Sequence, residues 1–160
     1  LNNAKSVQSL WQGIQLGESV INHAGKRLVR IVVAEIRRQI GGDKILMELE
    51  QTLADGRKRV RPQRPMAEKI IGEESPKVAL VRGLAEELSL KESDYSIVTP
   101  QPLVSKTNRM SGSYPGVMSQ YERHIFQVLA PNLPLENFTV VEPDGVRSAT
   151  WGWRDPVPGE

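Results

Sequence analysis

The segment that decides the fold runs from Glu68 to Leu90 and reads EKIIGEESPKVALVRGLAEELSL. Its middle predicts a short helix that begins after Ser75, because a serine hydroxyl can accept a hydrogen bond from a free amide of the first turn. Pro76 then occupies the first helical position, where its missing N–H is not needed. Helical spacing predicts one buried apolar stripe, made of Val78, Val81, Ala85 and Leu88, and an opposite charged side with Arg82, Glu86 and Glu87.

Glu86 and Glu87 are neighbours near the end of this helix. Adjacent residues are separated by about 100° around a helix, so both carboxylates can reach one cation. Carboxylate oxygens are the ligands that Mg²⁺ prefers. The pair therefore indicates a candidate metal site.

The same residues resemble the box of the Nudix hydrolase superfamily, G-x5-E-x7-R-E-U-x-E-E-x-G-U, in which U is a bulky aliphatic residue. Six of the nine specified positions match, namely Glu74, Arg82, Leu84, Glu86, Glu87 and Leu90. The resemblance implies an α/β fold, a Nudix-like α/β/α sandwich with a mixed sheet. It also implies that Glu74, Glu86 and Glu87 hold the metal, that Glu87 and Arg82 are catalytic, and that Arg82 orients the carboxylates by ion pairing.

Three positions depart from the pattern. Glu68 and Ser89 replace the two glycines, and Gly83 replaces the first glutamate of the core, which holds the metal in active members. A glycine inside a helix costs about 0.5 to 1 kcal/mol relative to alanine. Either a neighbouring loop or ligand approaches the bare backbone, or the position drifted after catalysis was lost.

A second element of the family is also changed. A Pro-Gly-Gly element usually precedes the helix loop and lets backbone amides approach a diphosphate, whereas this chain has the segment 65–68, Pro-Met-Ala-Glu. Near that approach, we expect a methionine side chain and an extra carboxylate to crowd and repel phosphate.

Two functions therefore stay open. The first is a Nudix-fold domain with a degraded hydrolase site, acting as a binding or regulatory module without a cofactor. The second is a hydrolase of nucleoside diphosphate-linked compounds that depends on Mg²⁺ or Mn²⁺. The lost glutamate favours the first. A carboxylate from a distant loop often completes such sites, and Glu122, Glu136 and Glu142 are candidates.

The composition is that of an ordinary globular domain. The chain has 160 residues, 25% of them charged and 39% hydrophobic, and a net charge of +2. We expect a helical extension at 1–26, the Nudix-like domain at 27–154 and an extended tail at 155–160. Because position 1 is Leu, we expect a processed product or a piece of a longer protein. No apolar run of about 18 residues predicts a membrane span. The absence of cysteine excludes disulfides and favours an intracellular location. The phrase Ser-Tyr-Pro-Gly at 113–116 and the Trp-x-Trp at 151–153 resemble Nudix-like proteins of plants and algae, which implies the cytosol or an organelle matrix such as the chloroplast.

Period-two patterns and β-branched runs predict the strands, and turn residues bound them. The expected strands are Arg27–Arg38, Lys44–Leu53, Lys58–Arg61, Tyr95–Val98, Ser119–Val128, Thr139–Val141 and Val146–Trp153. The polar segment Ser105–Gly116 is expected to be a surface loop. An extra N-terminal helix is indicated by apolar residues at helical spacing, Val7, Leu10, Trp11 and Ile14. It either packs on the domain, with Trp11 as a core residue, or faces a protein partner.

Two further features suggest ligand contacts. A basic cluster upstream of the helix comprises Arg57, Lys58, Arg59, Arg61 and Arg64. It is either a lip that contacts the phosphates of a nucleotide-like or diphosphate ligand, or a solvated hairpin arm. The cluster lacks interleaved aromatic residues, which argues against specific RNA contact. Trp151 and Trp153 either stack on a base or cap the core.

Overall fold

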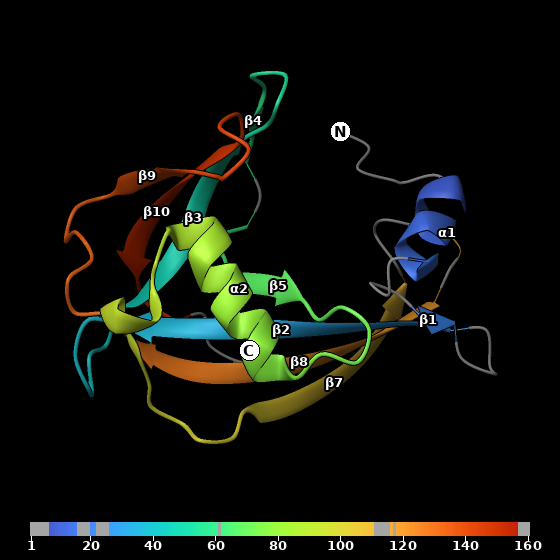
Figure 1. The fold of residues 1–160 in the computed structure, drawn as a ribbon, viewed down its shortest axis with the longest axis horizontal. Helices are drawn as coiled ribbons and strands as arrows, with labels where there is room; N and C mark the ends of the chain where they lie inside the picture. Colours follow the sequence, from blue (N-terminus) through green and yellow to red (C-terminus); the bar gives the residue numbers. More distant parts are fainter. Residues whose placement is uncertain are drawn as a thin grey trace.

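The computed structural model describes residues 7–15, 20–21, 26–60, 62–110, 116 and 118–156. Over these ranges the chain has a mixed α/β fold with two β-sheets (Figure 1). The elements in chain order are α1 (Val7–Gln15), β1 (Val20–Ile21), β2 (Arg27–Arg37), β3 (Ile45–Thr52), β4 (Lys58–Arg59), β5 (Met66–Lys69), α2 (Pro76–Leu88), the 3-10 helix η1 (Glu92–Asp94), β6 (Ser96–Ile97), β7 (Leu103–Met110), β8 (Met118–Leu129), β9 (Phe138–Val141) and β10 (Ser148–Arg154).

The larger sheet is six-stranded and is built on the parallel pair β2 and β8. The pair stays in register from Arg27 with Ser119 to Arg37 with Leu129. On the outer side of β2 lie β1 and β5, and on the outer side of β8 lie β6 and β7, all antiparallel. Buried β-branched residues in β2, such as Val32 and Ile36, explain why the apolar run predicted a strand.

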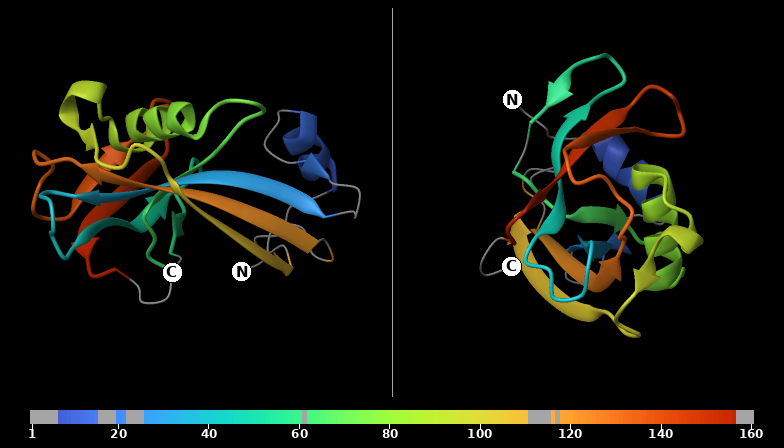
Figure 2. Two further views of the ribbon diagram at one scale, coloured as in Figure 1. Left: turned by 90° about the horizontal axis from the view of Figure 1, so that it is seen from below. Right: turned by 90° about the vertical axis from the view of Figure 1, so that its left-hand side faces the viewer.

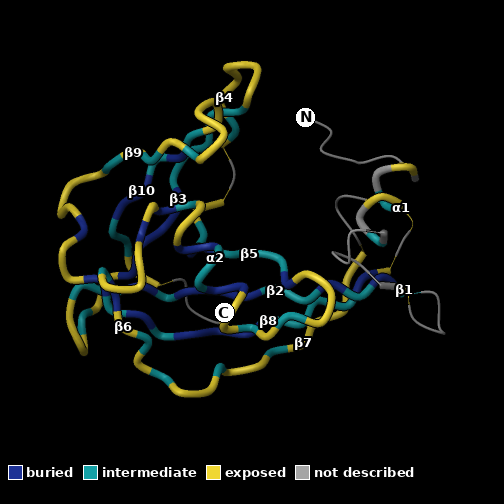
Figure 3. The backbone as a smooth tube through the Cα atoms, viewed as in Figure 1, coloured by how far each residue is buried: buried dark blue, intermediate teal, exposed yellow. Residues whose placement is uncertain are grey.

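The smaller sheet has the order β4-β3-β10-β9. The hairpin between β3 and β4 turns at Gly56, whose φ of 84° is a left-handed conformation that glycine adopts readily. The Asp-Gly turn predicted from the sequence is therefore confirmed. The pairing of β10 with β3 shifts register between Thr150 and Trp151. One hydrophobic core lies between α2 and the two sheets (Figure 3).

Helix α2 lies on one face of the larger sheet, across β2 and β8 (Figures 1 and 2). The predicted start is confirmed, because the Ser75 hydroxyl accepts a hydrogen bond from the Val78 amide at 3.2 Å and Pro76 is the first helical residue. The predicted buried stripe is partly wrong, since Val78 is 55% exposed and Ala85 is exposed. The helix instead buries Ala79, Leu80, Gly83, Leu84 and Leu88. Its small residues turn toward the sheet and let the helix approach closely.

Strands β7 and β5 were not predicted from the sequence. Leu103–Met110 forms β7 on the edge of the larger sheet, although Ser105–Gly116 was expected to be a surface loop. Nearly every residue of β7 is exposed, so the strand carries no alternation of apolar and polar residues. Met66–Lys69 forms β5, which pairs with β2 from Ile31 to Ala34. Pairing with a distant strand overrides the local signal there.

The extra N-terminal helix is confirmed as α1, which lies beyond the far end of β2 and β8 (Figures 1 and 2). The expectation that Trp11 is a core residue is wrong, because its side chain is 58% exposed. Neither helix in the described ranges has the length and apolar character needed to cross a bilayer. The prediction for Arg61 and for most of the tail, 157–160, lies outside the described residues.

Candidate functional site

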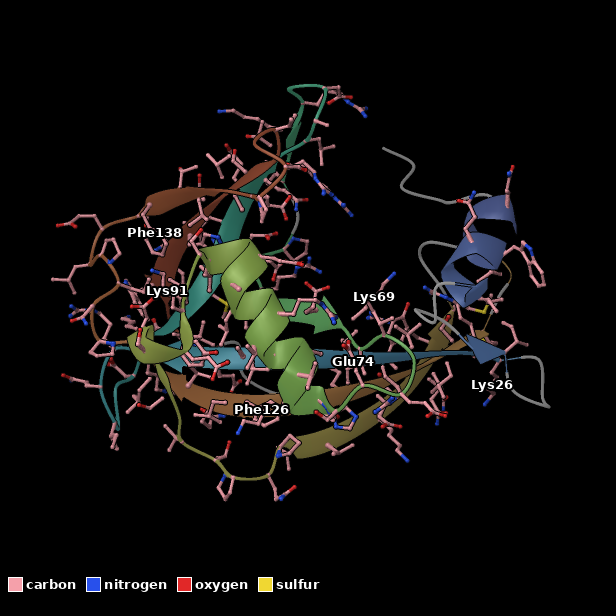
Figure 4. All side chains as sticks on the ribbon, viewed as in Figure 1. Lys26, Lys69, Glu74, Lys91, Phe126 and Phe138 are labelled. Carbon is pink, nitrogen blue, oxygen red and sulfur yellow. The ribbon has the colours of Figure 1, made fainter. Side chains whose placement is uncertain are left out.

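An ion pair fastens the loop before α2 to the helix. Arg82 Nη1 donates to both carboxylate oxygens of Glu74 at 2.6 Å, and Arg82 Nη2 donates to the Lys69 carbonyl at 2.6 Å. Glu74 also accepts a hydrogen bond from the Ile71 amide at 2.7 Å. Burial alone would raise the pKa of Glu74, but these donors hold it below its ordinary value. Figure 4 labels Glu74 and Lys69 in this region. Both oxygens of Glu74, a predicted metal ligand, are thus engaged by protein donors.

Glu87 is half-buried, and its Oε2 atom is shielded from solvent without a hydrogen-bond partner. Its pKa is raised to about 8, first by burial and then by neighbouring carboxylates. Those carboxylates are Glu68, Glu48 and Glu142, while Arg64 acts in the opposite direction. We call Glu48, Glu68, Glu87 and Glu142 the carboxylate cluster. At neutral pH the side chain of Glu87 therefore holds its proton most of the time.

The glycine at position 83 faces β5. A Cβ atom on Gly83 would lie 3.0 Å from Glu68 Cβ and 3.1 Å from Met66 Sδ, which is tighter than ordinary contact. Of the two explanations for Gly83, close approach of a neighbouring segment is therefore the one that the packing supports. The neighbour is strand β5, and one of the residues that fill the space is Glu68, itself a departure from the family pattern.

Glu86 immediately precedes Glu87 on α2, but its side chain is exposed. Its charge acts on Glu68, whose pKa is raised first by burial and further by Glu86 and Glu142, against the lowering effect of Arg82. Glu68 is thus the electrostatic neighbour that Glu86 and Glu87 share. The charges of two helix carboxylates therefore act on a third one that comes from a strand.

Sequence reasoning missed Glu48, took Glu68 only as an obstacle to phosphate and took Arg64 only as a member of the basic cluster. Glu48 is 5% exposed in β3, and its amide donates to the Arg64 carbonyl at 2.8 Å. No spacing in the sequence joins β3, β5 and α2, so this part of the site had no local signal. Among the three candidates from distant loops, the structure brings Glu142 into the cluster. Glu122 Oε1 instead lies 2.8 Å from His124 Nε2, and Glu136 is exposed.

The basic cluster is an exposed hairpin with partners close by in the chain. Arg57 pairs with Asp55 at 2.5 Å, and Lys58 pairs with Glu50 at 3.3 Å. Arg64 lies 3.9 Å from Glu48 and is the member that reaches the carboxylate cluster. Arg59, half-buried on β4, also has a partner in the fold. Ligand binding by Arg57 and Arg59 remains a prediction, because local ion pairs are compatible both with a lip that contacts phosphate and with a solvated hairpin arm.

Trp151 belongs to the hydrophobic core and is 1% exposed. Trp153 packs on the same core, and its indole N–H donates to the Pro134 carbonyl at 2.8 Å. The ring of Trp151 therefore presents no surface on which a base could stack. Of the two alternatives for the tryptophan pair, capping the core is the one that this placement supports.

The arrangement has the oxygen donors that Mg²⁺ and Mn²⁺ prefer, but the predicted ligands do not converge. Glu74 is held by Arg82, Glu86 faces solvent and Glu87 lies in the carboxylate cluster. Across the described ranges, no group of three or more His, Asp or Glu side chains is placed to hold one metal ion. Comparison with known proteins adds no assignment, because no family model and no curated protein matches the chain.

Proposed function

We propose that residues 27–154 form a Nudix-type domain whose hydrolase site is degraded and which acts as a binding or regulatory module. Two features support the family assignment. The box residues Ser75 to Leu88 form a capped helix, and a strand-turn-strand unit, β3 and β4, precedes it in the chain. The α/β/α sandwich is part of this proposal, with α2 as the helix on one face of the larger sheet.

The observation that carries the proposal is the packing around Gly83. In active family members a glutamate stands at this position and binds the metal. Here Met66 and Glu68 occupy the space into which any side chain at position 83 would project. For a glutamate to return to this position, Glu68 or Met66 must shift by a few tenths of an ångström. The change is therefore built into the packing of helix on strand.

The state of the remaining ligands supports the same conclusion. A carboxyl group binds a divalent cation as its anion, so a pKa of about 8 makes Glu87 a weak ligand at neutral pH. Glu74 is neutralised by Arg82. Removal of that proton at pH 7 costs about 1.4 kcal/mol, which weakens metal binding about ten-fold on top of the loss of one carboxylate.

A turnover assay tests the proposal. The wild-type chain is incubated with Mg²⁺ or Mn²⁺ and a panel of nucleoside diphosphate-linked compounds, beside Glu86→Gln. We expect no turnover above the protein-free rate for either protein. Turnover by the wild type that Glu86→Gln abolishes would refute the degraded-site proposal.

A second experiment reverses two departures from the family pattern, at positions 83 and 68. The double variant Gly83→Glu/Glu68→Gly returns both positions to the family pattern and removes the Cβ of Glu68 that the new side chain would meet. The single variant Gly83→Glu is the matched control, since it adds the carboxylate without clearing the space. Weak turnover in the double variant alone is the expected result.

One observation favours the second candidate function, a hydrolase that depends on Mg²⁺ or Mn²⁺. After burial, the charges of Glu68, Glu48 and Glu142 raise the pKa of Glu87, and Arg64 offsets them only in part. A divalent cation would relieve this repulsion, with Glu68 supplying from β5 the carboxylate that position 83 lacks. Under this alternative, Glu68→Gln abolishes turnover as completely as Glu86→Gln does.

Ligand and partner belong to the same proposal. A nucleotide-like or diphosphate ligand would approach the basic hairpin, where Arg57 and Arg59 lie, and RNA has weaker support there. The exposed ring of Trp11 supports a protein partner at α1. The intracellular location stays a prediction.

A further inference from the structure

Strand β7 leaves one edge of the larger sheet open. Its eight residues, Leu103–Met110, pair with β8 in continuous register from Leu103 with Ile125 to Met110 with Met118. Within the described parts of the chain, no strand pairs with its other side. Figures 1 and 2 show β7 at the rim of the sheet. On such an edge every second residue directs its N–H and C=O groups outward, where another strand can bind them.

The composition of β7 does not block pairing. The strand contains no proline, and its pairing with β8 shows no register shift. Apolar side chains remain exposed along it, Leu103 at 70%, Val104 at 47% and Met110 at 55%. Natural edge strands that avoid association use prolines, bulges or inward charges, and here only Lys106 and Arg109 serve that purpose.

Strand β7 can pair with β7 of a second copy only in certain registers. A two-fold axis perpendicular to the sheet keeps each side chain on its own face of the sheet. Because faces alternate along a strand, an even-numbered residue must lie opposite an even-numbered one and an odd-numbered residue opposite an odd-numbered one. Two such registers overlap over most of the strand. The first places Lys106 opposite Lys106 of the second copy, so like charges repel.

The second register centres the axis on Thr107. It pairs Val104 with Met110, Ser105 with Arg109 and Lys106 with Asn108, and Thr107 meets Thr107 of the second copy. No like charges lie opposite each other, the exposed side chains of Val104 and Met110 cover each other, and threonine pairs are favourable across strands. The strand is therefore complementary to itself in this register.

We propose that the chain forms a symmetric homodimer through antiparallel pairing of β7 with β7, centred on Thr107. The dimer joins two larger sheets into one continuous sheet. The carboxylate cluster contributes no residue to this edge, so the proposal stands apart from the function proposed for the site.

A single thiol tests the geometry, because the chain contains no cysteine. In Thr107→Cys, the two thiols of a dimer would lie across the axis, and a short thiol-to-thiol crosslinker should join them at dilute protein concentration. Ser93→Cys, exposed in η1, is the matched control. We expect covalent dimers from Thr107→Cys and few from Ser93→Cys. Equal, low crosslinking of both variants would overturn the proposal.

A pair of charge variants tests the register. Asn108 is exposed and faces Lys106 of the second copy twice in each dimer. Asn108→Lys should weaken dimerisation about five-fold, and Asn108→Glu should strengthen it by a similar factor. Dimerisation is measured for the full chain by analytical ultracentrifugation. Because these charges are exposed, high salt should reduce the difference in dimerisation affinity between the two variants. A wild-type chain that stays monomeric, or a dimer that both variants leave unchanged, would show that the β7 edge is not used in this way.

Discussion

Replacement of Glu87 by glutamine should stabilise the chain at neutral pH. The unfolded carboxyl, with its ordinary pKa of 4.5, is ionised at pH 7, whereas the folded one has a pKa of about 8 and stays mostly protonated. Each pH unit between 4.5 and 7 costs the folded state about 1.4 kcal/mol, so retention of the proton costs roughly 3 kcal/mol. Because the side chain keeps partial contact with water, we expect a measured gain of about 1 to 3 kcal/mol.

The direction of the pH dependence follows from the raised pKa. The folded state binds the proton more tightly than the unfolded state, so the wild-type chain loses stability as the pH rises from 4.5 to about 8. Glutamine resembles the protonated carboxyl and does not titrate. The two proteins should therefore be similar at pH 4 and differ most above pH 8.

Denaturant unfolding from pH 4 to pH 9 measures this effect, with a chelator present to remove divalent cations. Glu86→Gln is the matched control, since its exposed neighbouring position should change stability by less than about 0.5 kcal/mol. If Glu87→Gln lowered stability at pH 7, the carboxylate would have to be ionised and paired in the folded chain. The reasoning from burial and neighbouring charge would then be wrong.

Three further predictions concern the helix and its ends. Gly83→Ala should destabilise the chain by about 1 to 2 kcal/mol because its Cβ meets β5, and adding Glu68→Gly should recover part of the loss in denaturant unfolding; equal losses in both variants would contradict the packing argument. Ser89→Gly should raise stability by about 0.5 to 1 kcal/mol, since the φ of Ser89 is 56°, and a lower melting temperature would exclude relief of strain. Arg82→Ala should cost about 1 to 3 kcal/mol and expose the loop before α2 to limited proteolysis, because Glu74 loses its ion pair; an unchanged cleavage rate would show that the loop is held by other contacts.

Local chemistry allowed the main elements to be predicted. Ser75 and Pro76 specify where α2 starts, and the β-branched run predicts β2, because caps and propensities act over a few residues. The same reasoning failed for β7, an edge strand exposed almost throughout, whose pattern resembles that of a loop. It also assigned Val78 and Ala85 to the buried side of α2, because the side that is buried depends on where β5 lies.

The candidate site shows the same limit. The box predicted that Arg82 pairs with carboxylates and that Glu87 lies on α2, and the ion pair of Arg82 with Glu74 is a contact within one segment. Glu48 and Glu68 reach Glu87 only through the pairing of distant strands. The role of Glu68 in filling the space beside Gly83 could not be read from either residue alone.

Titration of the wild-type chain with Mn²⁺, followed by electron paramagnetic resonance at pH 7, tests the central claim most directly. A site that has lost its glutamate at position 83 and keeps Glu87 protonated should leave the signal of free Mn²⁺ unchanged apart from weak surface association. Tight binding of one ion that is lost in both Glu68→Gln and Glu87→Gln would contradict the account, because it would show that the carboxylate cluster is an intact metal site.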